Sequence, residues 1–285
     1  MGIIFGLLAS ISFALFFTFI KRSYEEFPPS IAFFFDMLFG LILWIPFSLI
    51  IGFNFSDLPL VFFFAALSAL LSEAFSFYVI SKGEVSLTGT VFSTYPIYTI
   101  LFSHLMLSEK LTTNQWVFII FTVLGTIIAS LPSKISLVDF RKKTFLLWAL
   151  AGAIAAGFSD TLSKTVIDKT SAATFLFALA ICQIPLSIAY LRIEKQKLSQ
   201  FKNFISTWKK YYYSIIGSFF SAFGLIFLWL AFEYTKASIA SPLTGSYPAL
   251  MVILAIFWLK ERPSKLELSG LMLAIFGVVG ISFFQ

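Results

Sequence analysis

The chain has 285 residues, of which 59% are hydrophobic and 12% are charged, and its formal net charge is +6. A soluble domain carries about 25% charged residues, so this chain has about half the charge that a water-facing surface needs. The lysines and arginines lie in short segments between long apolar runs, which does not favour nucleic-acid binding. With a mean hydropathy of +0.94, the composition excludes a soluble domain and indicates a protein that crosses the lipid bilayer several times.

Ten apolar runs follow one another along the chain, each close to the roughly 20 residues that a helix needs to cross a bilayer. Turn residues or charges separate the runs, and they lack the polar–apolar alternation of membrane β-barrel strands. We therefore predict an all-α polytopic membrane protein with ten transmembrane helices. The predicted spans are residues 2–20, 30–51, 58–81, 86–107, 113–131, 145–167, 171–190, 211–232, 237–258 and 265–284.

A longer connection joins the seventh span to the eighth. In it, Leu198, Phe201, Ile205 and Trp208 recur at helical spacing with lysines between them. The pattern predicts a short amphipathic helix on the membrane surface, and an irregular polar loop is the alternative.

One segment occurs twice. SYPALMVILAIFWLKER, residues 246–262, has a counterpart 152 positions earlier, TYPIYTILFSHLMLSEK, residues 94–110. Each copy has a Tyr-Pro pair, an apolar run, and a glutamate beside a basic residue. At the same offset Gly125 matches Gly277, and weaker similarities at offsets of 154 and 147 extend the match back to the first span. The chain thus contains two tandem units of five spans each.

An odd number of spans in each unit forces the second copy to enter the membrane from the opposite face. We therefore expect two inverted five-helix repeats, residues 1–132 and 145–285, joined by a linker loop at residues 133–144. Many secondary transporters have this architecture, with the substrate site at the repeat interface near the midplane.

Each repeat carries a proline inside an apolar span, Pro96 in the fourth and Pro248 in the ninth. Proline lacks the N–H group and clashes with the carbonyl four residues earlier, which belongs to Phe92 or Thr244. A freed carbonyl is tolerated in a membrane where it faces protein or a water-filled cavity. A matched pair of interrupted spans indicates a transport site, and a kink satisfied by neighbouring helices is the alternative.

The tandem ten-span layout resembles the EamA family of the drug/metabolite transporter superfamily. The Tyr-Pro, Glu-Lys/Arg and Gly positions that end each half, and the turns KGEVS and KASIA, carry this resemblance. It implies a secondary transporter of small metabolites or amino acids with a central cavity between the halves. One departure concerns an arginine that the family often has early in the second span of each unit. This chain has Asp36 there, and Ala178 at the matching position, so a substrate role of that arginine does not transfer.

Glu73 lies well inside the third span and has no charged residue within one helical turn. A charged group at the bilayer centre costs about 2.5–3.5 kcal/mol, so such residues usually face the bundle interior. We expect Glu73 to serve in proton or cation coupling, and a protonated, purely structural glutamate is the alternative.

Asp160 and Lys164 lie four residues apart on one face of the sixth span, where they can pair with each other. A structural ion pair and a substrate role, in which a zwitterionic solute inserts between the two charges, both stay open. Glu109 and Glu261 lie at span ends beside basic residues, where local ion pairs or helix-end anchoring explain them.

We predict that the third, fourth, eighth and ninth spans line a central cavity. Tyrosine combines an apolar ring with a hydroxyl group, which suits a site for small amphipathic solutes. The predicted substrate-binding residues are Tyr95, Pro96, Tyr247, Pro248, Thr244, Trp229, Asp160 and Lys164.

Other functions fit the sequence less well. One histidine and one cysteine do not build the usual metal or Cys–His sites, so we expect no cofactor, no bound metal and no enzymatic activity. A lipid flippase or scramblase is the nearest alternative, a membrane-embedded enzyme a more distant one, and a channel would need a ring of repeated charges or carbonyls. Both a monomer and a homodimer stay open.

The loop charges predict an orientation. With ten spans, both termini lie on one side of the membrane. Sixteen of the twenty Lys and Arg residues belong to the loops of the other side. The positive-inside rule puts those loops in the cytoplasm. We therefore expect a multi-pass protein of the bacterial inner (plasma) membrane with both termini outside, although the superfamily usually has its termini inside.

Overall fold

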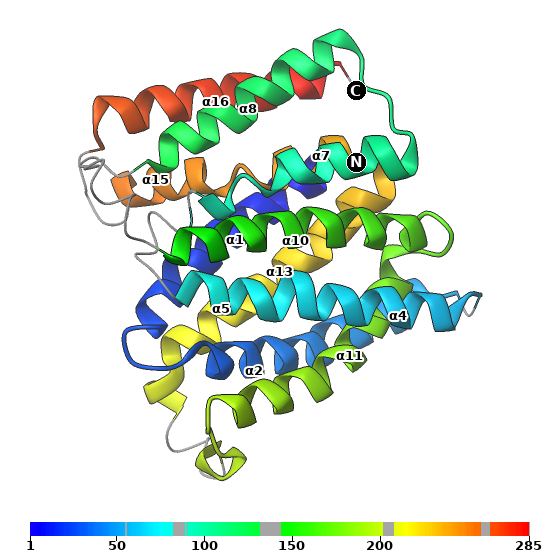
Figure 1. Ribbon diagram of the computed structural model, residues 1–285, viewed down its shortest axis with the longest axis vertical. Helices are drawn as coiled ribbons and strands as arrows, with labels where there is room; N and C mark the ends of the chain where they lie inside the picture. The colour runs from blue at the N-terminus through cyan, green and yellow to red at the C-terminus, as the bar shows by residue number, and fades with distance from the viewer. Residues whose placement is uncertain are drawn as a thin grey trace.

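The computed structural model describes residues 1–54, 56–81, 89, 91–131, 144–201, 208–257 and 263–284. The regular secondary structure of these residues is entirely helical, and the helices run across the view in Figure 1 with both chain termini at the same side of the bundle. The first repeat holds α1 (Gly2–Ser23), α2 (Pro29–Phe39), η1 (Gly40–Trp44), α3 (Ile45–Ile51), α4 (Leu58–Ser68), η2 (Ala69–Ala74), α5 (Phe75–Ser81), α7 (Tyr95–Leu107) and α8 (Thr113–Ser130). The second holds α10 (Thr144–Ile167), α11 (Ala172–Ile193), η3 (Leu198–Phe201), η4 (Trp208–Tyr211), α13 (Tyr212–Tyr234), α14 (Ala237–Thr244), α15 (Tyr247–Phe257) and α16 (Lys265–Phe283).

These helices form the ten predicted spans. Nine stretches of the described residues are long and apolar enough to cross a membrane, and α7 is a shorter apolar helix in the fourth span. The second span consists of α2, η1 and α3, the third of α4, η2 and α5, and the ninth of α14 and α15. The prediction of an all-α protein with ten transmembrane helices is therefore confirmed.

The packing of the helices follows the inverted repeat. α1 packs on α13, and its counterpart α10 packs on α4, η2 and α5, which together are the counterpart of α13. Three further contacts each join a span to its own counterpart: α2 packs on α11, α7 on α14, and α8 on α16. This symmetry is what two five-span units of opposite direction produce when they interlock along one face.

The contact between α8 and α16 depends on small residues. A Cβ atom added to Gly125 would lie 2.2 Å from the backbone nitrogen of Ala274, and one added to Gly277 would lie 2.4 Å from that of Thr122. Both pairs are related by the offset of 152 positions. Only glycine lets two backbones approach this closely in a membrane, so the glycine match in the sequence reflects symmetric packing.

Spans four and nine are both interrupted directly before the Tyr-Pro pair, and the hydrogen bonds at the two breaks correspond. Thr94 donates its N–H and, at 2.7 Å, its hydroxyl to the Val91 carbonyl, and Ser246 donates the same two groups to the Leu243 carbonyl. In both copies the proline lies in the first turn of the new helical segment, where its missing N–H costs nothing. The predicted interruption is confirmed.

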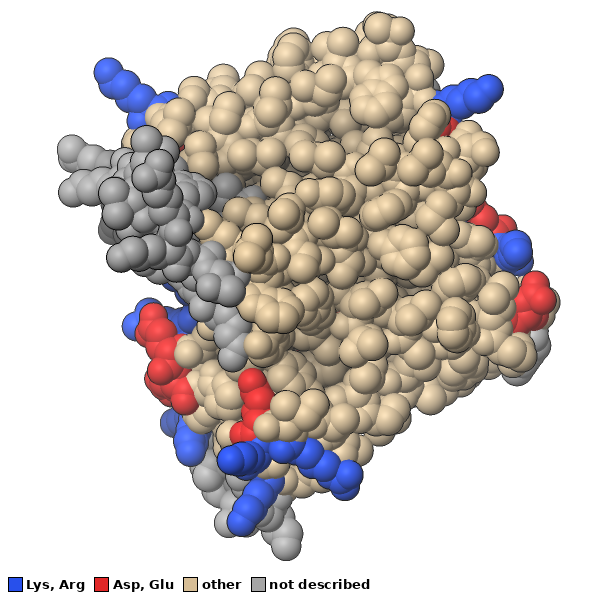
Figure 2. Space-filling model, in the orientation of Figure 1, with Lys and Arg blue, Asp and Glu red and all other residues tan. Residues whose placement is uncertain are grey.

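Charged side chains gather at two opposite margins of the molecule, and the broad surface between them is uncharged in the view of Figure 2. Many large apolar side chains of the described residues are exposed, for example Ile50, Leu105 and Met272. Such a belt fits contact with lipid.

The connection between spans seven and eight begins and ends in short 3₁₀ turns, η3 and η4, and residues 202–207 lie outside the described residues. Phe201 does not face away from the protein, because its ring stacks on that of Phe34 at 4.5 Å. Both ends of the segment are thus 3₁₀ turns, and the middle of the predicted amphipathic helix lies outside the described residues.

Candidate functional site

A cavity of about 70 Å³ lies between the two repeats. Side chains from spans one, three, four, six, eight and nine surround it, so the four spans expected from the sequence all contribute, together with two more. Ligand pockets usually measure roughly 300–1,000 Å³. The cavity is therefore smaller than a typical ligand pocket, and the two repeats are packed compactly around it.

Two carboxylates and a set of aromatic rings dominate the cavity wall. Glu73 and Asp160 are 6% and 2% exposed, and no lysine, arginine or histidine of the described residues lines the cavity with them. The lining aromatic residues are Phe13, Phe16, Phe17, Phe77, Phe92, Tyr95 and Tyr247. Aromatic faces and carboxylates both attract cations, so this lining suits a positively charged solute with an apolar part.

Glu73 reaches the cavity from η2, a π-helical turn in the middle of the third span. Such turns widen the helix and are frequent at functional sites. Asp160 and Asp36 are the charged groups in its electrostatic surroundings. The distortion thus places one buried acid close to two others.

Asp160 is held by a chain of hydroxyl groups. The hydroxyl of Thr99 donates to its carboxylate at 3.3 Å, and the hydroxyl of Ser241 donates to Thr99 at 3.0 Å. Further along the same helices, the hydroxyls of Ser103 and Thr161 lie 3.3 Å apart. These contacts join α7, α10 and α14 on the side of the cavity that faces the chain termini.

The two tyrosines expected at the cavity wall are both there but have different surroundings. The hydroxyls of Tyr95 and Thr244 are hydrogen-bonded at 3.0 Å. The Tyr247 hydroxyl is buried and has no hydrogen-bond partner among the described residues, while its ring stacks on Phe17 at 4.5 Å. The Tyr247 hydroxyl thus stays unpaired among the described residues at the cavity wall, and Tyr95 connects the two repeats.

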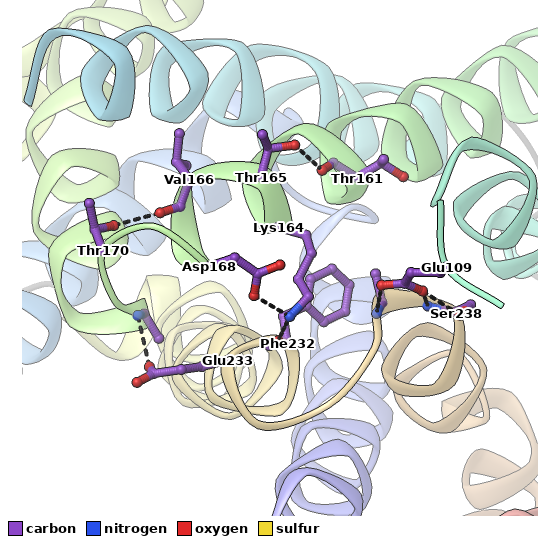
Figure 3. Close-up of polar contacts among 12 residues, drawn as sticks. Glu109, Thr161, Lys164, Thr165, Val166, Asp168, Thr170, Phe232, Glu233 and Ser238 are labelled. Atoms are coloured by element: carbon purple, nitrogen blue, oxygen red, sulfur yellow. Dashed lines mark hydrogen bonds and ion pairs between the residues drawn. The ribbon is translucent and has the colours of Figure 1, made fainter. Parts of the chain in front are cut away.

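Lys164 is not at the cavity. Its amine donates to the Asp168 carboxylate at 2.5 Å and to the Phe232 carbonyl at 2.6 Å (Figure 3). The suggested pairing with Asp160 is therefore wrong. The reason is that Lys164 lies in the last turn of α10 and its long side chain extends toward the helix end, where Asp168 is half-exposed.

The remaining predicted residues lie around the cavity rather than in its wall. Trp229 is fully buried between Phe175 and Phe232, whose ring centroids are 4.8 and 5.5 Å away. Pro96 of the fourth span packs against Gly245, which lies at the helix break of the ninth span. Pro248 is the counterpart of Pro96 in the ninth span. Their substrate roles stay predictions.

Two carboxylates bind the N-termini of helices on the side of the bundle where the chain termini lie. Glu109 accepts the backbone N–H groups of Ala237 at 2.9 Å and Ser238 at 3.0 Å, together with the Ser238 hydroxyl (Figure 3). Glu233 accepts the N–H of Ala172 at 2.8 Å. A negative group at a helix N-terminus is stabilising. The expected helix-end anchoring by Glu109 is thus confirmed, and Glu261 lies outside the described residues.

Sequence reasoning missed one part of the cavity wall and one buried pair next to it. Phe13, Phe16 and Phe17 of the first span line the cavity, and their spacing of three and four residues was visible as a one-sided aromatic stripe. Asp36, placed by the sequence near a span end, is fully buried and accepts a hydrogen bond from Gln183 at 3.2 Å. Gln183 carries no charge, so only the packing of the helices shows this pair.

A model of the EamA-like transporter family matches residues 1–131 and again residues 143–283. The chain belongs to the EamA-like transporter family. The two matches cover nearly the whole chain, and the internal repeat of the family corresponds to the two five-span units described above.

Two relatives and one solved structure extend this comparison. An uncharacterized protein of Methanocaldococcus jannaschii is 31% identical over 140 residues, which are 49% of this chain and 96% of that protein. An S-adenosylmethionine uptake transporter of Rickettsia conorii is 24% identical over 244 residues, 85% of this chain and 79% of that protein. A protein of known crystal structure has the same fold, with a TM-score of 0.75 and 16% identity over 99% of this chain and 96% of its own.

Proposed function

We propose that this EamA-family protein is a secondary active transporter that moves small metabolites across the membrane by alternating access. The observation that carries the proposal is the buried cavity at the interface of two inverted repeats, with two acids and seven aromatic residues in its wall. Inverted repeats usually hold the substrate at this interface and rock about it. The repeats extend over residues 1–132 and 145–285 in this proposal, and the protein resides in the bacterial plasma membrane.

The hydrogen bonds around the cavity support an arrangement closed toward the chain termini. Thr99, Ser103 and Glu109 follow Tyr95 along the fourth span toward that side, and each contacts the second repeat. A transport cycle has to break these contacts when the cavity opens to the terminal side.

The proposed substrates are amino acids or related amphipathic metabolites that carry a positive charge. The acidic and aromatic cavity wall supports this class, because no described basic residue is there to repel a cation. The Rickettsia relative is named for the uptake of S-adenosylmethionine, a sulfonium cation that also carries an amino-acid group. This compound is therefore one member of the class to test.

Glu73 is the proposed coupling residue. A buried carboxylate in a membrane span can serve as a proton relay, so Glu73 can exchange a proton for a cationic solute, whether the cycle runs as proton coupling or as solute exchange. Replacing Glu73 by glutamine keeps the size and the hydrogen bonding of the side chain but removes the carboxyl group that binds and releases the proton. Glu73→Gln should leave binding intact and abolish the pH dependence of accumulation. Full accumulation with an unchanged pH profile would assign Glu73 a structural role.

The substrate class is tested by thermal unfolding of the purified protein with a panel of cationic, zwitterionic and anionic metabolites. A ligand at a hundredfold excess over its Kd stabilises the native state by about 2.7 kcal/mol. Cationic members should raise the melting temperature, and Asp160→Asn should weaken the effect. The exposed Asp57 supplies a matched control, because Asp57→Asn removes an acid far from the cavity. Stabilisation by anions alone contradicts the proposal.

An apolar groove on the outer surface favours lipid as a second candidate cargo. It lies between α7 and α8, measures about 430 Å³ and has His104 as its single polar lining residue. A lipid headgroup needs a polar path across the membrane, and the polar side chains lie in the central cavity instead. A lipid-scrambling assay in vesicles separates the two functions, and we expect no scrambling.

A further inference from the structure

A stripe of polar residues on α11 and at its C-terminal end contacts α2. Its members recur at intervals of four, three and four positions, so they share one face of the helix: Gln183, Ser187, Tyr190 and Glu194. The two ends of the stripe contact α2 directly. The Gln183 amide donates to Asp36 at 3.2 Å, and Glu194 accepts the backbone N–H of Ser30 at 3.0 Å. We call the zone between these two contacts the α2–α11 seam.

Hydrogen bonding in the seam is incomplete. Half of the twelve buried side-chain atoms that lack a hydrogen-bond partner among the described residues belong to it. They are the Asp36 Oδ1, the Gln183 Oε1 and the hydroxyls of Tyr24, Ser30, Ser187 and Tyr190. Buried polar groups are nearly always paired with protein or with ordered water, and buried water usually joins two to four such groups. The seam therefore gathers six buried polar atoms that ordered water can satisfy.

The seam connects the interior with one surface of the molecule. From Gln183 to Glu194 it follows eleven helical positions, or roughly 16 Å at 1.5 Å per residue. Its inner end touches the transport site, because Ser221 lies beside Asp36 and also lines the cavity. At its outer end Glu194 is half-buried, and the neighbouring Lys195 is exposed.

Charges around Asp36 are few and of one sign. From η2, Glu73 lies within its electrostatic range, and the Tyr24 hydroxyl faces it from the segment after α1. α11 and α13 contribute only the neutral side chains of Gln183 and Ser221. None of the ion pairs among the described residues involves Asp36. A proton is the smallest cation that can neutralise this buried carboxylate.

We propose that Asp36 and Gln183 form a proton-binding site, separate from the central cavity, which a file of water in the α2–α11 seam connects to the basic end of the molecule. A proton passes along the water file and forms an O–H bond with the free Oδ1, so the carboxylate becomes a carboxylic acid. Gln183 continues to donate to Oδ2, and Glu194 lies at the outer end of the seam, where its carboxylate accepts the Ser30 N–H. That this site supplies Glu73 during transport rests on the proposed function.

The water file is tested in the unmodified protein by pulsed hydroxyl-radical footprinting, which oxidises buried side chains that lie next to bound water. Tyr190 is 9% exposed and packs on Phe33, yet it should be oxidised several-fold faster than the fully buried Phe175, which lies in the apolar core. Equal oxidation of Tyr190 and Phe175 overturns the proposal.

The proton site is tested by infrared spectroscopy of the protein in nanodiscs. Titration should produce a protonated-carboxyl band that is lost in Asp36→Asn. On transfer to D₂O this band should shift about tenfold more slowly in Ser187→Val, because the variant breaks the water file. Ser163, another buried serine without a partner among the described residues, gives the matched control, and Ser163→Val should leave the rate unchanged.

The proposal is contradicted if the protonated-carboxyl band persists in Asp36→Asn. It is also contradicted if the band of Ser187→Val shifts in D₂O as fast as that of the unmodified protein. Loss of the band on adding sodium at constant pH would assign the site to a metal cation and also overturn it. Neither measurement uses a substrate, so a failure here is distinct from a failure of the transport function.

Discussion

The hydroxyls of Tyr95 and Thr244 lie 3.0 Å apart and join the fourth span of one repeat to the ninth span of the other. Both residues stand at the helix breaks, and the Thr244 hydroxyl also interacts with the Ser241 carbonyl at 3.0 Å. This hydrogen bond therefore crosses the repeat interface at the edge of the cavity. Its two-fold counterpart does not exist, because Phe92 stands in the first repeat where Thr244 stands in the second.

Removing the hydroxyl groups of the two tyrosines should have different consequences. Tyr95→Phe deletes the inter-repeat hydrogen bond and should lower the free energy of unfolding by about 0.5–1.5 kcal/mol. Tyr247→Phe deletes a hydroxyl without a partner among the described residues, so it should leave stability nearly unchanged and weaken substrate binding. Thermal unfolding and uptake into proteoliposomes measure the two effects. Equal effects of both substitutions on stability and on uptake would contradict this division of roles.

The Glu109 carboxylate should contribute to the closed terminal side. Glu109→Ala leaves two N–H groups at the start of α14 without their acceptor and should cost about 1–2 kcal/mol of stability. It should also increase labelling of a cysteine at Ser241, a buried residue on that side, by a water-soluble thiol reagent. Glu26→Ala is the control, because Glu26 is exposed at the opposite, basic end. Unchanged labelling in Glu109→Ala would show that the contact does not hold the bundle closed.

The symmetric glycines of α8 and α16 should tolerate no side chain. Gly125→Ala and Gly277→Ala place a methyl group against the backbone of the facing helix and should each cost about 1–3 kcal/mol through overpacking. Gly89→Ala meets no atom of the described residues within 4 Å of the added carbon and should be neutral or slightly stabilising. Thermal unfolding of the three variants measures these changes in stability. An unchanged free energy of unfolding in Gly125→Ala would mean that α8 and α16 separate easily.

The membrane orientation is open to a direct measurement. The end of α1, the end of α11 and η4, which carry or adjoin Lys21, Lys195 and Lys210, lie at the end of the bundle opposite to the chain termini. The positive-inside rule places that end in the cytoplasm. A reporter active only in the cytoplasm should therefore give signal when fused after Lys197 and none when fused after Gln285. Strong signal from the fusion after Gln285 would reverse the orientation.

The sequence by itself determined the number of spans, their limits and the repeat. Each of these features rests on local patterns: apolar length sets the span, and the repeated Tyr-Pro segments align the two halves. The α1 helix ends at Ser23 and the α13 helix at Tyr234, within three residues of the predicted limits. The match between Gly125 and Gly277 was also visible in the sequence, because each of the two helices needs a glycine where its backbone contacts the facing helix.

Only the tertiary structure decided which polar residues meet. Asp160 and Lys164 share a helix face, but the geometry of the helix end directs the lysine to Asp168. The pair of Asp36 and Gln183 joins residues 147 positions apart, and no periodicity in either span signals it. Side-chain partners across helices depend on how two whole surfaces pack, and a linear pattern does not contain the relative rotation of two helices.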